Sequence, residues 1–140
     1  MFIKNYHIGG RLFADAVGSI HLASTADLDQ AVCVKLLHPE LTGDAEIVQA
    51  FHQCAEYSCA LRDDALVNTL SHGEDSGFHY LVLENVGFEQ LARRLHQSRA
   101  LPFFEAVDVI QKVAHFLRTV HIEGLLHGCL TPYDVFVSKD

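Results

Sequence analysis

The order of its amphipathic segments predicts that this chain has an α+β fold. Three short apolar runs separated by turn residues come first, followed by a segment with helical periodicity, two more strand-like runs and two helical segments. Strands followed by helices are typical of an antiparallel sheet, whereas a parallel sheet needs alternating strands and helices. The sequence therefore predicts a five-stranded antiparallel sheet with one helix, followed by a helical region.

The composition is that of a folded globular chain. Of its 140 residues, 49% are hydrophobic and 20% are charged, with nine glycines and three prolines, which excludes the disordered and collagen-like classes. The formal net charge is −8. We expect no nucleic-acid partner, because binding a phosphate backbone needs clustered lysine and arginine.

The N-terminus and the cysteines indicate a cytoplasmic protein. The opening MFIKNYHIGGRLF lacks the apolar core of a signal peptide, and no run reaches the ~18 apolar residues of a membrane span. The cysteines at 33, 54, 59 and 129 include no CxxC pair. We expect reduced thiols, and a disulfide or a metal site are the alternatives.

The strands are expected at 6–13, 19–25 and 31–37, with a short hairpin loop at 27–30. A second pair is expected in ALVNTLSHG and FHYLVLENV. The connection between them is EDSG, in which Gly77 can take the positive φ of a tight turn.

A helix between the two groups of strands is expected to begin at Thr42 or Asp44, with Glu46 in its first turn. Its apolar positions at 47, 51, 54 or 55, and 58 fall on one face. Such a face is expected to pack on the sheet.

Two further helices are expected, in FEQLARRLHQ and from about Phe103 to Glu123. The longer one is apolar around most of its circumference, which is typical of a buried helix. Its narrow polar stripe consists of Asp108, Lys112, His115 and Thr119. Because few residues follow this helix, either another chain completes its core or the native protein continues beyond Asp140.

Three segments carry a family resemblance: AVCVKLLHPEL, YLVLENV and LLHGCLTPYDVFV. Together with the order of elements, they resemble the phosphate-pairing strand, the hinge strand and the catalytic loop of a bacterial Ser/Thr protein kinase domain related to eukaryotic kinases. The resemblance runs from Tyr6 to Val137 and ends before the DFG segment. It implies a kinase-like N-terminal lobe over 1–86 and the first two helices and catalytic-loop remnant of the C-terminal lobe over 87–140.

The resemblance makes Lys35 the phosphate-pairing lysine. The residues that would surround it differ from those of the family. The glycine-rich loop positions are occupied by Phe13, Asp15 and Gly18, so that Asp15 would bring negative charge to where phosphates lie. Cys54 stands where the family has the glutamate that holds this lysine. Lys35 is therefore expected to lack a partner and to be a structural or surface cation, with a residual phosphate contact as the alternative. Glu56 points elsewhere, about 200° further around the helix.

In the catalytic loop, His127 matches the family's structural histidine and Gly128 replaces an arginine. Cys129 replaces the catalytic aspartate, Thr131 replaces a lysine, and Asp134 replaces the magnesium-binding asparagine. A carboxylate at Asp134 can still bind a metal, but a thiol is mostly protonated at neutral pH and is a poor ligand for Mg²⁺. We therefore expect no enzymatic phosphoryl transfer and consider Lys35, Cys54, Cys129 and Asp134 vestigial.

Two functions remain open for this degenerate, truncated kinase-like chain. The first is a pseudokinase that acts as an interaction, scaffold or regulatory module, either as a homodimer or with a protein partner, through the exposed face of helix 103–123. The interface candidates are Val109, Ile110, Val113, Phe116 and Leu117.

The alternative is a nucleotide sensor without phosphoryl transfer. The resemblance gives it a site formed by Ile20, Lys35, Leu83, Glu84 and Val86. We expect no ATP or other cofactor, because Cys33 and Phe136 are larger than the residues they replace and are expected to fill the adenine slot.

Overall fold

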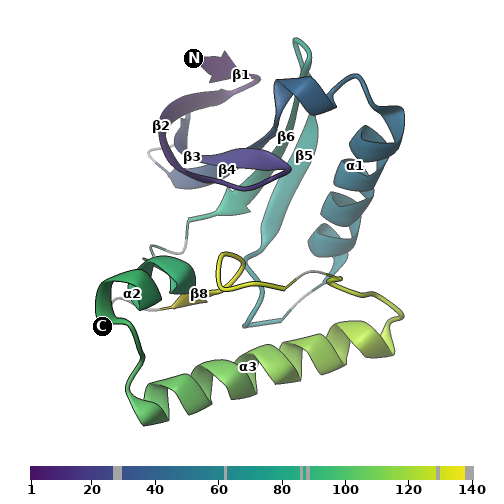
Figure 1. Ribbon diagram of the computed structural model, residues 1–140. Helices are drawn as coiled ribbons and strands as arrows, with labels where there is room; N and C mark the ends of the chain where they lie inside the picture. The colour runs from purple at the N-terminus through teal and green to yellow at the C-terminus, as the bar shows by residue number, and fades with distance from the viewer. Residues whose placement is uncertain (27–29, 62, 86, 88, 129, 138–140) are drawn as a thin grey trace. The chain divides into compact units, whose positions relative to one another are not determined.

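The computed structural model describes residues 1–26, 30–61, 63–85, 87, 89–128 and 130–137 (Figure 1). The chain divides into two compact units. The first consists of Met1–Arg62 with Val67–Asn85, and the second of Asp63–Leu66 with Val86–Asp140. Each unit contains its own antiparallel sheet.

The first unit is built on a six-stranded sheet with the order β1-β2-β3-β4-β6-β5. Its strands are β1 Phe2–Ile3, β2 Tyr6–Ala14, β3 Gly18–Thr25, β4 Ala31–Leu37, β5 Thr69–Asp75 and β6 Phe78–Glu84. All five expected strands are present, and Gly77 has the expected positive φ, 82°. The short edge strand β1 was not expected, because two residues carry no periodic signal.

Residues pointing to one face of this sheet form its core. Val34 on β4 and Val82 on β6 lie directly opposite each other and are both 0% exposed. The buried cluster comprises Ile3, Ile8, Ala23, Val32, Val34, Leu36, Tyr80 and Val82. Burial of each large apolar side chain contributes about 1.5–3 kcal/mol, so these alternating positions fix the strand register.

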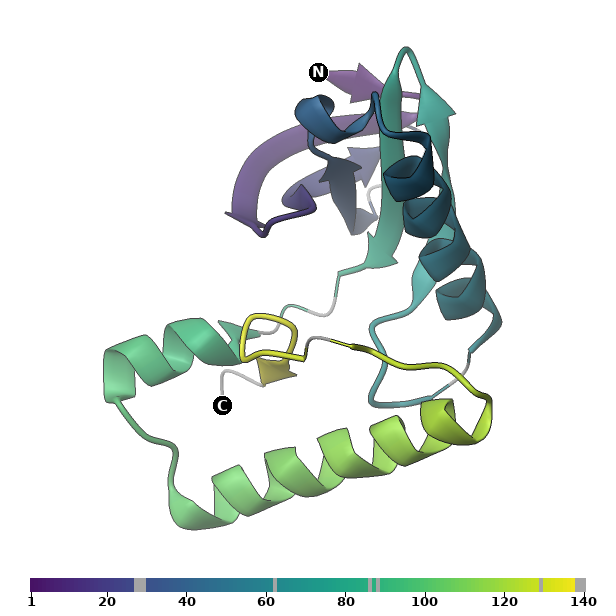
Figure 2. The ribbon, with the colours of Figure 1, turned by 45° about the vertical axis from the view of Figure 1, so that its right-hand side comes forward.

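Helix α1, Ala45–Ala60, lies beside β5 in both ribbon views (Figures 1 and 2). It begins as predicted after Asp44, whose Oδ1 accepts the N–H groups of Glu46 and Ile47 at 3.0 and 3.2 Å. Phe51 and Ala55 are its buried residues. A single turn of 3-10 helix, η1 Pro39–Leu41, precedes it.

The second unit contains α2 Leu91–Ser98, α3 Phe103–Ile122 and the two-stranded sheet of β7 Glu89–Gln90 and β8 Phe136–Val137. The helix expected in FEQLARRLHQ thus begins only at Leu91. The preceding Glu89 and Gln90 pair with Val137 and Phe136 instead. This pairing joins distant parts of the chain, so local periodicity could not predict it.

Helix α3 matches the predicted long helix, but much of its apolar surface is exposed. Val120 is its one buried residue, whereas Ile110 is 67% exposed and Phe104 is 85% exposed. Within the described residues, no helix combines the length and apolar character needed to cross a membrane.

Candidate functional site

Asp15 organises the turn between β2 and β3. Its Oδ1 accepts the N–H groups of Val17 and Gly18, both at 2.8 Å, and its own N–H donates to the carbonyl oxygen of Gly18 at 2.9 Å. Gly18 has no space for a side chain, because a Cβ there would lie 2.2 Å from the carbonyl oxygen of Leu36 on β4. The glycine that survives at this family position is therefore required by the packing of β3 on β4.

Lys35 on β4 forms an ion pair with the same aspartate. Its Nζ lies 2.6 Å from Asp15 Oδ2, and the two side chains are 20% and 35% exposed. The expectation that Lys35 lacks a partner was therefore wrong. The partner lies in the β2–β3 turn rather than on α1.

The pKa of the Asp15 carboxyl lies below its ordinary value. Burial alone would raise this pKa, but the hydrogen bond from Lys35 and the backbone N–H groups of Gly18 and Val17 lower it further than burial raises it. Asp15 is therefore a carboxylate at neutral pH. It balances the charge of Lys35 from within the chain.

The expected nucleotide-site residues of this unit lie on neighbouring strands. Ile20 on β3 is directly opposite Lys35 and is only 9% exposed. Leu83 on β6 is opposite Cys33 on β4. Cys33 is half-buried, and burial raises the pKa of its thiol. Ile20, Leu83 and Cys33 thus belong to the central strands of the sheet.

Glu84 is the last residue of β6, and its side chain binds Asn68, the residue before β5. Its Oε1 accepts the backbone N–H of Asn68 at 2.8 Å and the side-chain amide of Asn68 at 3.0 Å. Val86, the last expected residue of the nucleotide site, lies outside the described residues. Cys54 is exposed on α1, and Cys33, Cys54 and Cys59 are free thiols.

In the second unit, the loop that resembles the catalytic loop is closed by Asp134. Its Oδ2 accepts the N–H of Thr131 at 2.8 Å and the hydroxyl of Thr131 at 2.9 Å, and its own N–H donates to the carbonyl oxygen of Thr131 at 3.0 Å. His127 is exposed, and Gly128 has a φ of 79°. Cys129 lies outside the described residues.

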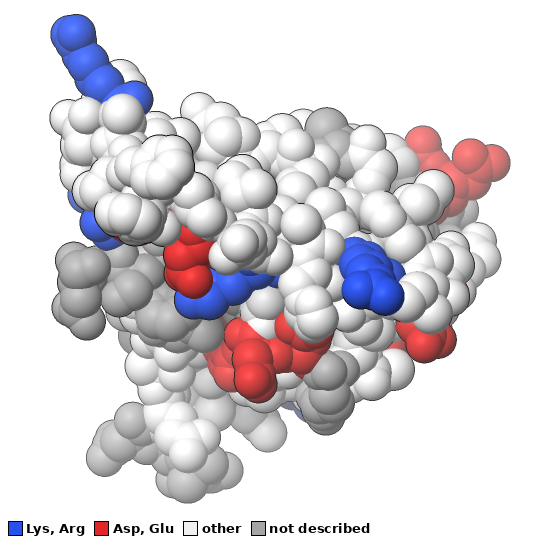
Figure 3. All heavy atoms as spheres, turned by 90° about the horizontal axis from the view of Figure 1, so that it is seen from below, with Lys and Arg blue, Asp and Glu red and all other residues white. Residues whose placement is uncertain are grey.

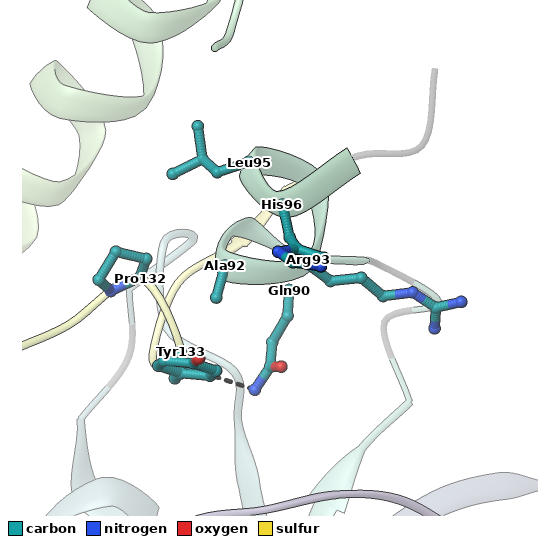
Figure 4. Close-up of a pocket in the computed structure, with 7 residues that line it drawn as sticks. All are labelled: Gln90, Ala92, Arg93, Leu95, His96, Pro132 and Tyr133. Atoms are coloured by element: carbon teal, nitrogen blue, oxygen red, sulfur yellow. Dashed lines mark hydrogen bonds between the residues drawn. The ribbon is translucent and has the colours of Figure 1, made fainter. Parts of the chain in front are cut away.

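The second unit also has an open groove that the sequence did not predict (Figure 4). The side-chain amide of Gln90 donates to the carbonyl oxygen of Tyr133 across it, at 2.8 Å. Its lining residues come from the end of β7, from α2 and from the turn before β8: Gln90, Ala92, Arg93, Leu95, His96, Pro132 and Tyr133. This groove depends on a turn distant in sequence that packs on α2, where the N–H of Ala92 donates to Pro132.

No group of three or more His, Cys, Asp or Glu side chains is placed to hold a metal ion in the part of the chain that the structure describes. Two residues that the resemblance assigns to binding a phosphate or a metal ion are instead bonded to other side chains of this chain. Lys35 binds Asp15, and Asp134 binds Thr131.

The chain matches no protein-family model, but curated kinases are similar to it. A probable serine/threonine-protein kinase of Clostridium acetobutylicum is 25% identical over 137 residues, which cover 98% of this chain and 21% of the relative. The serine/threonine-protein kinase pkn2 of Myxococcus xanthus is 30% identical over 128 residues, which cover 91% of this chain and 15% of the relative.

Solved structures show the same fold. The kinase domain of PknI from Mycobacterium tuberculosis superposes with a TM-score of 0.86 at 21% identity, and the match covers 100% of this chain and 57% of that domain. The chain therefore has a kinase-like fold and spans little more than half of a kinase domain. It is homologous to bacterial serine/threonine-protein kinases over most of its length.

Proposed function

We propose that this kinase homologue transfers no phosphate and acts as a protein-binding module. The observation that carries the proposal is the ion pair between Lys35 and Asp15, with 2.6 Å between Nζ and Oδ2. In protein kinases the lysine of this strand binds nucleotide phosphates. Here the chain supplies its own anion, so a phosphate would have to displace Asp15.

Displacement is unfavourable because Asp15 is also held by the turn. Its Oδ1 accepts two backbone N–H groups, and moving the carboxylate would leave both without that acceptor. A phosphate beside the carboxylate would add charge repulsion on the order of 1–4 kcal/mol at about 4 Å, depending on solvent access. Both effects weaken nucleotide binding at Lys35.

The catalytic-loop residues of this chain are poorly suited to phosphoryl transfer. Cys129 stands where the family has the catalytic aspartate, and Asp134 stands where it has the magnesium-binding asparagine. One oxygen of Asp134 already accepts two hydrogen bonds from Thr131. A general base typically contributes ~10²–10⁴-fold to a rate, and a protonated thiol cannot replace it.

Thermal unfolding with ATP and ADP, with and without Mg²⁺ or Mn²⁺, tests this proposal. We expect no saturable shift, whereas a nucleotide at 100 times its Kd would add about 2.7 kcal/mol of stability. Incubation with γ-labelled ATP and a general protein substrate is expected to give no labelled protein. Label that disappears in Lys35→Ala or Asp134→Ala would contradict the proposal.

A nucleotide sensor is the second candidate, and the retention of Lys35 on β4 favours it. Its signature is a saturable thermal shift without labelled protein. We expect Lys35→Ala to abolish such a shift and Lys112→Ala, which removes an exposed lysine from α3, to leave it unchanged.

For the binding module we propose α3 as the contact surface and a second copy of this chain as the partner. The interface candidates Val109, Val113, Phe116 and Leu117 are half-buried, and Ile110 is exposed. Viewed from below, the charged side chains lie in a few separate groups among other residues (Figure 3). The exposed large apolar side chains of α3 are Phe103, Phe104, Val107, Ile110 and Ile122, and exposed apolar surface is typical of interfaces.

A further inference from the structure

Three histidines from three elements of the first unit form a hydrogen-bonded chain, with His52 of α1 in the middle. The Nδ1 of His52 lies 3.1 Å from Nδ1 of His72 on β5, and its Nε2 lies 3.0 Å from Nδ1 of His79 on β6. All three side chains are half-buried. This histidine chain therefore connects α1 to the β5–β6 hairpin through one imidazole ring.

The number of protons that the histidine chain can hold is limited by its geometry. Each of the two N···N contacts needs one hydrogen, and the outward Nε2 atoms of His72 and His79 can each carry one more, so four hydrogens fit. Three neutral imidazoles bring three hydrogens. One added proton is therefore accepted with both hydrogen bonds intact, but a second added proton places two N–H groups against each other and breaks a contact.

The geometry of the histidine chain suits the binding of a proton better than the binding of a metal ion. His52 meets its two neighbours through opposite ring nitrogens, and the lone pairs of those nitrogens diverge. One ion therefore cannot bind all three rings in the tetrahedral geometry that Zn²⁺ adopts.

The groups around His52 oppose its charging. Burial, followed by the neighbouring His72 and His79, lowers the pKa of His52 below its ordinary value, and Glu56 on the same helix only partly offsets this. On β5, Glu74 is opposite His79 in register, but its Oε1 accepts the N–H of Gly77 at 2.7 Å.

We propose that the histidine chain is an acid-sensitive contact that holds α1 on the β5–β6 hairpin at neutral pH and releases it on acidification. An imidazole in water takes up a proton near pH 6.5, whereas the geometry of the intact histidine chain leaves room for only one added proton. Protons therefore favour the released state, and the stability of the contact falls as pH decreases through about 6.5. The buried residues of α1 are Phe51 and Ala55, which do not titrate.

Amide hydrogen exchange at pH 7.5 and 5.5 tests this proposal, with EDTA present and exchange times scaled to the intrinsic rate at each pH. We expect the opening constant of α1 to increase about tenfold between these values if release takes up one proton, and about a hundredfold for two. Amides of β4, which contains no histidine, serve as the internal reference. In His52→Gln, whose amide donates and accepts without titrating, the increase is expected to disappear.

The matched control is His115→Gln, which removes an exposed histidine from α3 and is expected to keep the full increase. If His52→Gln does not fold, His79→Gln removes one contact and is expected to reduce the increase. Equal pH dependence of α1 exchange in the unchanged chain and in the folded histidine variant would overturn the proposal. Full protection of α1 at pH 5.5 in the unchanged chain would also overturn it.

Discussion

Asp15 has two separable roles, one in the β2–β3 turn and one in the ion pair with Lys35. The turn uses Oδ1, and the ion pair uses Oδ2. An asparagine keeps an acceptor oxygen for the backbone N–H groups of Val17 and Gly18 but has no charge, whereas an alanine loses both interactions. Comparing the two substitutions therefore separates the roles.

We expect Asp15→Asn to lower the free energy of unfolding by less than about 1 kcal/mol at pH 7, because partly exposed ion pairs contribute little. Asp15→Ala should cost about 1–2 kcal/mol more, since it also removes the turn hydrogen bonds. Urea unfolding at equilibrium measures both values. Glu40→Gln, which removes an exposed carboxylate from η1, is the control, and equal losses in the two Asp15 variants would contradict separate roles.

The ion pair also predicts a pH dependence. Because the pKa of Asp15 is lower in the folded chain, the unfolded chain binds this proton first as the pH falls. The stabilisation is therefore fully present above the ordinary value of about 3.9 and is lost as the pH falls through the lower folded value. The stability difference between the unchanged chain and Asp15→Asn should decrease over that range.

The sequence identified the positions at which this chain departs from the kinase pattern, but it did not predict the contacts that the residues at these positions make. Motif comparison placed Lys35 correctly on a strand and Asp15 correctly in the turn between β2 and β3, yet it assigned Lys35 no partner. The contact spans 20 positions and depends on how the turn folds back over β4. The histidine chain was missed for the same reason, because His52, His72 and His79 come from three elements.

At the scale of elements, periodicity and capping residues predicted the long segments well. The helix after Asp44 and the helix from Phe103 begin where the sequence indicated. The very short strands β1, β7 and β8 were missed, because a two-residue strand is defined by its distant partner and not by its own pattern. Elements that depend on local signals are thus predictable, and those that depend on tertiary pairing are not.

The N-cap of α1 gives a prediction at this scale. Asp44→Ala is expected to lower the free energy of unfolding by about 1 kcal/mol, because two N–H groups of the first turn lose their acceptor. Asp44→Ser should recover most of this loss, since serine is also a good N-cap. Chemical unfolding followed by circular dichroism measures the change. A serine variant as unstable as the alanine variant would contradict the capping role.

At the scale of the whole molecule, α3 presents apolar surface that its own unit leaves exposed. A 20-residue helix is about 30 Å long, which is enough to contribute to an interface of about 800 Å² per partner. The net charge of −8 disfavours association of two copies at low salt. We therefore expect an apolar contact whose strength is maintained or increased when salt screens this repulsion.

Ile110→Lys tests this contact, because Ile110 is 67% exposed and its replacement is expected to leave the fold intact. Sedimentation equilibrium at micromolar concentration should show a dimer for the unchanged chain and a monomer for Ile110→Lys, which places a charge in the apolar contact. Gln111→Lys makes the same charge change at the adjacent exposed position and should remain dimeric. An unchanged chain that is monomeric at both low and high salt, and that binds no dye specific for exposed apolar surface, would show that α3 forms no such contact.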